Sequence, residues 1–177
     1  MFRNIFVSFV ITGLVLLGCF LVIYYMRDVR EVSFLQCVDG DTAWFLVDGK
    51  KEKVRFLAID APEIAHDGEM ADYYGDNAKE YVCKKLTGAK NISIEYDNSS
   101  DARDKYGRLL GWIFVDGKNL NLLLVQKGYA MVRYVYGNYS YVDIMCDDQE
   151  KAYQQELGMW KYKKDMYKES YCFKKNI

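Results

Sequence analysis

Charged residues on either side of a short apolar run are the feature that most constrains this chain. Residues 54–63 read VRFLAIDAPE, so Arg55 opens an apolar run that Asp60 closes. A second carboxylate, Asp41, lies in the sequence VDGDT at 38–42. Burying such groups beside a strand is costly unless they pair with one another, coordinate a metal or bind a ligand. The pattern therefore favours a fold in which these side chains share a site.

The spacing of apolar and turn-forming residues predicts an α+β domain built on short strands. Residues 32–38, 43–47 and 53–59 are expected as three strands of a meander, with a hairpin turn at residues 48–49. The elements expected after them are a helix at 70–86, strands at 91–96 and 109–115, a helix at 119–127, extended backbone at 129–135 and a helix at 142–157. Short strands with helices between them indicate a small β-barrel on which the helices pack.

The amino terminus carries a long uncharged apolar segment. Residues 5–26 contain neither a charged side chain nor a proline, and a helix needs about 20 apolar residues to cross a bilayer. We therefore expect one transmembrane helix, within a region at 1–31 that also includes a short tail and a linker. A lipoprotein signal is an alternative, because residues 16–19 read LLGC and loosely resemble a lipoprotein box. A cleaved signal peptide is another.

The rest of the chain is expected to form one domain at 32–165 and a carboxyl-terminal tail at 166–177. Arg3 precedes the apolar segment and Arg27 follows it, so the distribution of positive charge does not settle the membrane orientation.

The cysteines leave several possibilities open. Cys37, Cys83, Cys146 and Cys172 follow the apolar segment and permit two disulfides, with three connectivities. One disulfide and buried free thiols are equally compatible with the pattern. The chain has a single histidine, His66, and no CxxC spacing, which argues against a zinc site.

The charge of the chain restricts how it can bind nucleic acid. The formal net charge is −1, whereas proteins that grip a duplex through many phosphates are usually basic. Extended duplex binding is therefore not supported, and a small site with a local positive patch remains open. Some of the 16 tyrosines can stack on bases, although most are expected to serve packing.

The acidic residues have the chemistry of a hard-cation site. Asp41 and Asp60 supply carboxylate oxygens, and Pro62 restricts the backbone of Ala61, so the carbonyl there has a defined direction. Oxygen ligands without His or Cys favour Ca²⁺ or Mg²⁺, and two carboxylates leave positions open for water and substrate. Each segment alone also has a structural interpretation: a β-turn at 39–42, or a surface ion pair of Arg55 with an acid.

Taken together, the motifs resemble the staphylococcal nuclease (thermonuclease) family. The resemblance covers about residues 32–162 and rests on VDGDT at 38–42, VRFLAIDAPE at 54–63, DKYGR at 104–108, LVQKGYAMVRYVY at 124–136 and LGMW at 157–160. It implies a five-stranded oligonucleotide/oligosaccharide-binding (OB-fold) barrel with three helices. It also implies Ca²⁺ held by Asp41, Asp60 and the backbone carbonyl of Ala61. Family members often carry Thr at the last position, and the change to Ala keeps a main-chain ligand.

The same resemblance implies roles for the remaining site residues. Glu63 matches the proposed general base, and Arg55 and Arg108 match residues that contact the phosphate. The positions that match the lining of the nucleotide pocket are Lys105, Tyr106, Tyr134 and Tyr136.

These inferences converge on a membrane-tethered, Ca²⁺-dependent nuclease. We expect it to hydrolyse DNA and RNA, to favour single-stranded regions, to leave 3′-phosphorylated products and to act as a monomer without a protein partner. Its domain is expected outside the cell membrane, where Ca²⁺ is more abundant, or secreted after signal cleavage. The alternative is a non-catalytic OB-fold module that binds nucleic acid or protein. The complete set Asp41, Arg55, Asp60, Glu63 and Arg108 favours the enzyme.

Overall fold

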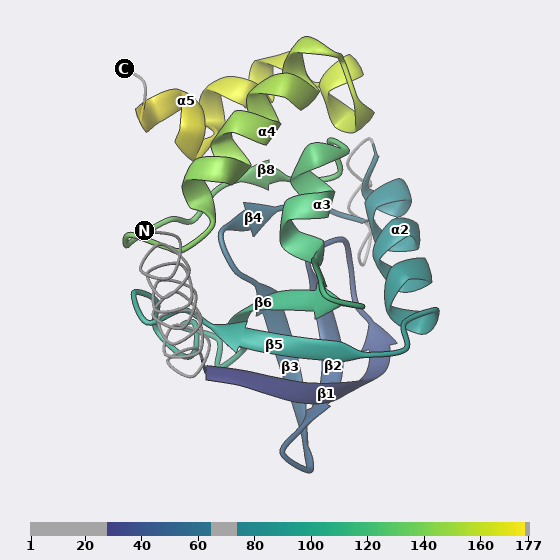
Figure 1. Ribbon diagram of the computed structural model, residues 1–177. Helices are drawn as coiled ribbons and strands as arrows, with labels where there is room; N and C mark the ends of the chain where they lie inside the picture. The colour runs from purple at the N-terminus through teal and green to yellow at the C-terminus, as the bar shows by residue number, and fades with distance from the viewer. Residues whose placement is uncertain (1–27, 65–73, 176–177) are drawn as a thin grey trace, which may run out of the picture.

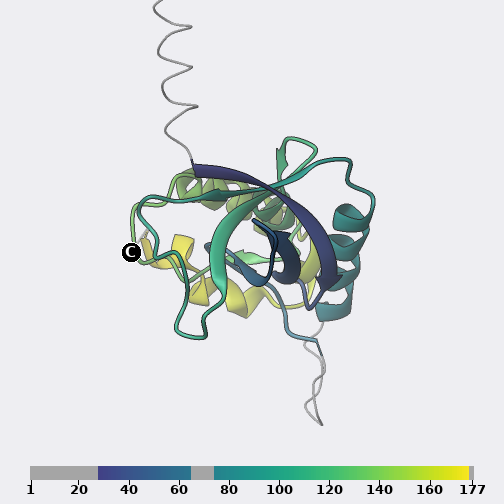
Figure 2. The ribbon, with the colours of Figure 1, turned by 90° about the horizontal axis from the view of Figure 1, so that it is seen from below.

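Five strands close into a barrel in the computed structural model, which describes residues 28–64 and 74–175. They are β1 (Asp28–Cys37), β2 (Thr42–Val47), β3 (Lys50–Phe56), β5 (Ile92–Tyr96) and β6 (Leu109–Val115). The first three form an antiparallel meander, and β1 also pairs with β5, which pairs with β6. Parallel pairing of β3 with β6 closes the ring, whose interior is seen in Figure 2. The OB-type barrel expected from the sequence is confirmed.

Alternating side chains fill the barrel. In β2, Ala43, Phe45 and Val47 point inward and are buried, while Leu46 is exposed. Apolar side chains from the other strands complete this core: Val54, Phe56, Ile94 and Ile113. Period-two alternation of this kind is the pattern of a strand with one face on a core, and it explains why the sequence located these strands.

The expected strand at 53–59 is wrong in one respect that matters for the site. It ends at Phe56, and a separate strand β4 (Ile59–Asp60) pairs with β8 (Met131–Val132) outside the barrel. Ala58 between them has φ 60°, a left-handed conformation that breaks the strand. β8 is likewise much shorter than the extended segment expected at 129–135. As a result Asp60 leaves the barrel wall.

Three main helices cover the barrel: α2 (Gly75–Thr87), α3 (Leu120–Gln126) and α4 (Val142–Gln154). Figure 1 shows α3 between the barrel and α4, with α2 along one side. The Asn119 side chain caps α3 by accepting a hydrogen bond from the amide of Leu122, at 3.0 Å. A two-residue strand, β7 (Lys118–Asn119), leads into this cap.

Both ends of the domain extend beyond the expected boundaries. The boundary at residue 32 falls inside β1, because residues 28–31 pair with β5 rather than forming a linker. Residues expected as a tail are folded: after the 3₁₀ turn η1 (Gly158–Lys161) come η2 (Lys164–Glu169) and α5 (Tyr171–Lys175). Their apolar side chains join a second core with Met131, Ala152 and Trp160.

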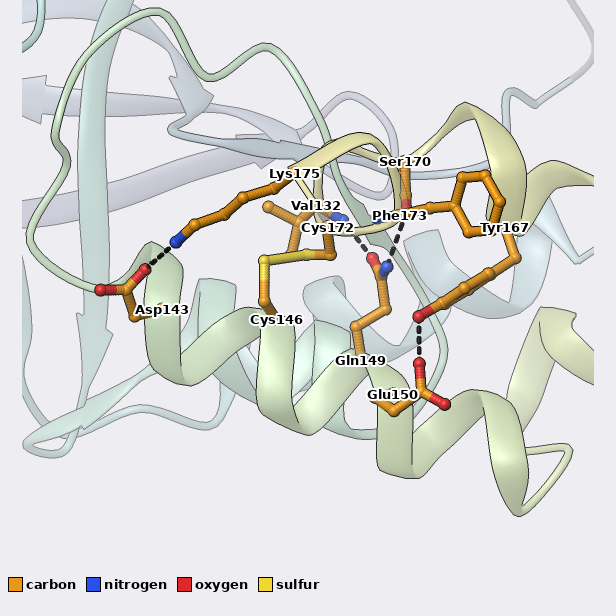
Figure 3. The surroundings of a disulfide bond; sticks show 10 residues. All are labelled: Val132, Asp143, Cys146, Gln149, Glu150, Tyr167, Ser170, Cys172, Phe173 and Lys175. Carbon is orange, nitrogen blue, oxygen red and sulfur yellow. Dashed lines mark hydrogen bonds and ion pairs between the residues drawn. A yellow bond between two sulfur atoms is a disulfide. The ribbon is translucent and has the colours of Figure 1, made fainter. Parts of the chain in front are cut away.

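Two disulfides connect the cysteines. Cys37–Cys83 joins β1 to α2, and Cys146–Cys172 joins α4 to α5, as Figure 3 shows for the second pair. The alternatives of free thiols or a single disulfide therefore do not hold.

The predicted transmembrane segment at 5–26 lies outside the described residues, as does His66. Within residues 28–64 and 74–175, no helix has both the length and the apolar character needed to cross a bilayer.

Candidate active site

Most of the predicted site residues line one pocket. It has a volume of about 580 Å³ and lies between the β3–β4 segment, the loop at 101–108 and the segment at 134–139. Predicted site residues in its lining are Arg55, Asp60, Glu63, Lys105, Tyr106, Arg108, Tyr134 and Tyr136. Asp41 and Ala61 are buried; Asp41 pairs with Arg55 of this lining, and the amide of Ala61 donates to Asp41. Segments far apart in the sequence thus meet at one place.

Arg55 joins the two predicted metal-binding carboxylates. Its Nη1 lies 3.0 Å from Oδ2 of Asp41, and its Nη2 lies 3.2 Å from Oδ1 of Asp60. Nη1 also donates to the carbonyl of Ile59 at 2.8 Å. The side chains are 8–15% exposed, so this pairing offsets a substantial cost of burial. The shared partner brings Asp41 and Asp60 to one locus.

Asp41 is fixed by the turn that precedes β2. Its amide donates to Oδ1 of Asp39 at 2.9 Å, and its Oδ2 accepts from the amide of Ala61 at 2.8 Å. Gly40 permits this approach, because a Cβ there would lie 2.7 Å from the Cβ of Ala61 and 2.9 Å from that of Ala78. The glycine in VDGDT is therefore required by packing.

Burial raises the pKa of Asp41 to about 7, although Arg55 and the Ala61 amide act in the opposite direction. Arg55 alone does not compensate this buried carboxylate. A further cation at Asp41 would favour its ionised form.

The donor set fits a hard divalent cation. Asp41 and Asp60 converge on Arg55, and Ala61, whose amide contacts Asp41, follows Asp60 directly. Within the described ranges no three or more His, Cys, Asp or Glu side chains form a metal cluster. A site here would therefore need the Ala61 carbonyl and water in addition to two carboxylates. Such an open set of oxygen ligands suits Ca²⁺ or Mg²⁺.

Asp104 organises the loop that carries Arg108. Its Oδ1 accepts from the amides of Tyr106 and Arg108, at 2.9 and 3.0 Å, and its Oδ2 lies 2.6 Å from Nε of Arg108. Partial burial acts to raise the pKa of Asp104, but these hydrogen bonds outweigh it and the pKa is lowered. Gly107, with φ 80°, supplies the left-handed residue that this turn needs. The loop thereby aims the guanidinium of Arg108 at the pocket.

Glu63 reaches the pocket from the segment that enters α2. Its side chain is exposed and belongs to the pocket lining. A Cβ on Gly75, the first residue of α2, would lie 2.3 Å from the Glu63 carbonyl oxygen. The first residue of α2 therefore packs directly against the Glu63 backbone and helps to position Glu63 beside the pocket.

Exposed tyrosines form the rim. Tyr106, Tyr134 and Tyr136 are 71, 46 and 84% exposed, an unusual state for large aromatic side chains. The guanidinium of Arg55 lies 5.7 Å from the ring centroid of Tyr134, and that of Arg108 lies 5.5 Å from that of Tyr106. Aromatic faces beside cations are suited to stacking on bases while phosphates are bound.

Sequence reasoning missed Arg133. Its Nη1 lies 3.0 Å from Oδ2 of Asp60, the oxygen that Arg55 does not take. The sequence did offer a signal for it, a single basic residue directly after the apolar pair at 131–132. That segment was interpreted only as extended backbone. Tyr139 also lines the pocket and was not predicted.

Comparison with known proteins identifies the family of this chain. The family model described as "Staphylococcal nuclease homologue" matches residues 53–162. The chain belongs to the staphylococcal nuclease family. Relatives include Endonuclease YncB of Bacillus subtilis, 37% identical over 135 residues that cover 76% of this chain and 63% of that protein. Thermonuclease of Staphylococcus intermedius is 31% identical over 135 residues, covering 75% of this chain and 79% of the relative.

Some family members are longer than this chain. The SPbeta prophage-derived endonuclease YokF of B. subtilis is 36% identical over 135 residues, covering 76% of this chain but only 45% of that protein. The chain thus spans less than two thirds of the length of these two B. subtilis relatives.

Proposed function

We propose that this protein is a Ca²⁺-dependent nuclease that hydrolyses phosphodiester bonds of DNA and RNA. The observation that carries the proposal is the position of Asp41 and Asp60. They share Arg55 at the base of a pocket that Arg108 and Glu63 also reach. Membership of a family whose relatives bear the names endonuclease and thermonuclease supports it.

The side chains divide the chemistry between charge stabilisation and proton transfer. When bound, Ca²⁺ would supply Lewis-acid polarisation of a phosphate oxygen. Arg55 and Arg108 donate to phosphate oxygens and offset the negative charge that grows on them as water attacks, because a guanidinium stays charged and binds two oxygens at once. Glu63 accepts the proton of the attacking water or orients that water.

Cleavage of labelled single-stranded DNA by the full-length chain, purified in mild detergent with Ca²⁺ or a chelator, tests this function. Replacing Glu63 with Gln is expected to lower the rate about 10²–10⁴-fold, the usual contribution of a general base. Arg108→Ala is expected to lower it about 10²–10³-fold. The matched controls are Glu156→Gln and Arg30→Ala, whose exposed ion pairs lie outside the pocket lining.

The outcomes separate the two hypotheses. Cleavage that needs Ca²⁺ and falls in both site variants supports the nuclease. Binding of single-stranded DNA without Ca²⁺-stimulated cleavage would instead assign the chain to a non-catalytic binding module.

The exposed tyrosine rim supports a preference for single-stranded substrate, since stacking requires bases outside a duplex. The net charge of −1 agrees, because it offers no long cationic track for a duplex. Competition between single- and double-stranded oligonucleotides measures this preference, and end analysis of the products tests for 3′-phosphates.

We also propose that residues 5–26 anchor the domain to the cell membrane with the domain outside. The two disulfides support this orientation, because disulfides persist in oxidising compartments. Protease treatment of intact cells should digest the domain, and protection from the protease would place it inside.

A further inference from the structure

Arg133 lies between two carboxylates that are far apart in the chain, Asp60 and Glu169. Its Nη1 is 3.0 Å from Oδ2 of Asp60, and its Nη2 is 3.4 Å from Oε2 of Glu169. Arg55 takes the other oxygen of Asp60, at 3.2 Å. Guanidinium groups therefore hold both oxygens of a proposed metal ligand. Each group has a second anionic partner, Asp41 for Arg55 and Glu169 for Arg133.

Glu169 belongs to the carboxyl-terminal segment, which lies beyond the family match that ends at residue 162. We use "C-terminal strap" for residues 164–175, the segment of η2 and α5. The disulfide Cys146–Cys172 ties the strap to α4, and Tyr167 of the strap donates a hydrogen bond to Glu150 of the same helix (Figure 3). The strap is thus anchored on both sides of Glu169.

A single buried side chain aligns the two partners of this ion pair. Gln149 is fully buried; its Oε1 accepts from the amide of Val132 at 2.6 Å, and its Nε2 donates to Oγ of Ser170 at 3.0 Å (Figure 3). Val132 precedes Arg133, and Ser170 follows Glu169. Gln149 therefore sets the spacing between Arg133 and Glu169 through their immediate neighbours.

We propose that Arg133 is a positioning residue that holds Asp60 while no cation is bound, and that Glu169 draws Arg133 away when a divalent cation takes Asp60. The strap thereby sets how tightly the site holds its cation. This inference rests on the proposed function, because it requires Asp60 to be a metal ligand.

Electrostatic repulsion sets the direction in which Arg133 changes the affinity for the cation. A guanidinium in contact with Asp60 repels a dication bound to the same carboxylate. Arg133 can leave Asp60 and keep Glu169 as an ionic partner, whereas the second partner of Arg55 is Asp41, which is itself a proposed metal ligand. Removing Arg133 should therefore strengthen cation binding, and removing the charge of Glu169 should weaken it.

Calorimetric titration of the full-length chain in detergent with Ca²⁺ alone tests the proposal without nucleic acid. Arg133→Gln is expected to lower the Kd for Ca²⁺ about tenfold, and Glu169→Gln to raise it about threefold, as partly screened charges would. Arg133→Lys keeps the charge and should stay closer to wild type than Arg133→Gln. Glu31→Gln, the loss of an exposed carboxylate on β1 outside the pocket lining, should leave the Kd unchanged.

A double variant separates action through Arg133 from a direct effect of charge. Glu169→Gln should change the Kd little when Arg133 is already Gln, because its effect passes through that guanidinium. An equal effect in both backgrounds would overturn the proposal, as would weaker or unchanged Ca²⁺ binding by Arg133→Gln at an unchanged melting temperature. If Arg133→Gln does not fold, the other two variants decide. A Kd that rises about threefold in Glu169→Gln and stays near wild type in Arg133→Lys supports the proposal, and an unchanged Kd in Glu169→Gln overturns it.

The behaviour of the wild-type chain distinguishes failure of the Arg133 proposal from failure of the proposed nuclease function. A wild-type chain that binds Ca²⁺ and cleaves DNA, with variants that fail these expectations, refutes only the role of Arg133. A wild-type chain that neither binds Ca²⁺ nor cleaves DNA refutes the proposed function and this inference with it.

Discussion

Asn121 joins α3 to the turn that precedes β4, and replacing it with Leu tests how strongly that link stabilises the fold. The side chain is fully buried. Its Oδ1 accepts from the amide of Ile113 at 3.0 Å, and its Nδ2 donates to the carbonyl of Leu57 at 3.0 Å. Leu57 begins the turn that carries the chain out of the barrel towards Asp60.

The expected loss follows from the groups left without partners. Leu has nearly the shape of Asn, so changes in packing contribute little. The amide of Ile113 and the carbonyl of Leu57 each lose a buried hydrogen bond, at about 1–3 kcal/mol each. We therefore expect the free energy of unfolding to fall by about 4 kcal/mol, a large part of the usual total of about 5–15 kcal/mol.

Urea unfolding followed by tryptophan fluorescence measures this loss, because Trp112 and Trp160 are fully buried. For a urea m-value of about 2 kcal/mol/M, the midpoint should move down by about 2 M with the slope unchanged. Asn98→Leu on an exposed loop is the matched control and should move it little. A midpoint shift below about 0.5 M for Asn121→Leu would refute the reasoning that these two backbone groups depend on it.

Three further changes test other parts of the structure. The pKa of Asp97 is lowered, because hydrogen bonds from Ser140, Ser99 and Trp112 outweigh its burial. Its stabilisation is therefore complete above the unfolded pKa of about 3.9 and is lost as the pH falls through the lower folded value. The deficit of Asp97→Asn in unfolding free energy should thus be smaller at pH 2 than at pH 7; an equal deficit would contradict this. Replacing both Cys146 and Cys172 with Ser removes a disulfide of sequence separation 26 and should lower the free energy of unfolding in urea by about 3.5 kcal/mol. An unchanged free energy of unfolding would show that the strap stays folded without the disulfide. Gly40→Ala places a Cβ 2.7 Å from that of Ala61 and should lower the free energy of unfolding by about 1–3 kcal/mol. It should also weaken Ca²⁺ binding measured by calorimetry; wild-type binding would show that the turn can shift to accommodate the methyl group.

The strands were predictable where the pattern was local. The strands at 91–96 and 109–115 were placed to within about one residue, because alternation and flanking turns identify them. The run at 53–59 looked equally regular, yet it breaks at Ala58. No local residue signals that break. It is stabilised by contacts to distant residues, including the amide of Leu57 with the carbonyl of Gly111, at 3.0 Å.

The sequence by itself predicted the barrel class, because period-two alternation and turn chemistry are local properties of the chain, and its ordered motifs nominated site residues through the family resemblance. The roles given to those residues stay predictions. Only the tertiary structure decided how charges pair around Asp60: Arg55 on one oxygen, Arg133 on the other, and Glu169 behind Arg133. Ion pairing depends on distance in space, and the segments that supply Arg133 and Glu169 lie far from Asp60 in the chain. The costly charges beside the apolar run thus pair with one another, as the sequence suggested, and also with Arg133, which no local pattern named.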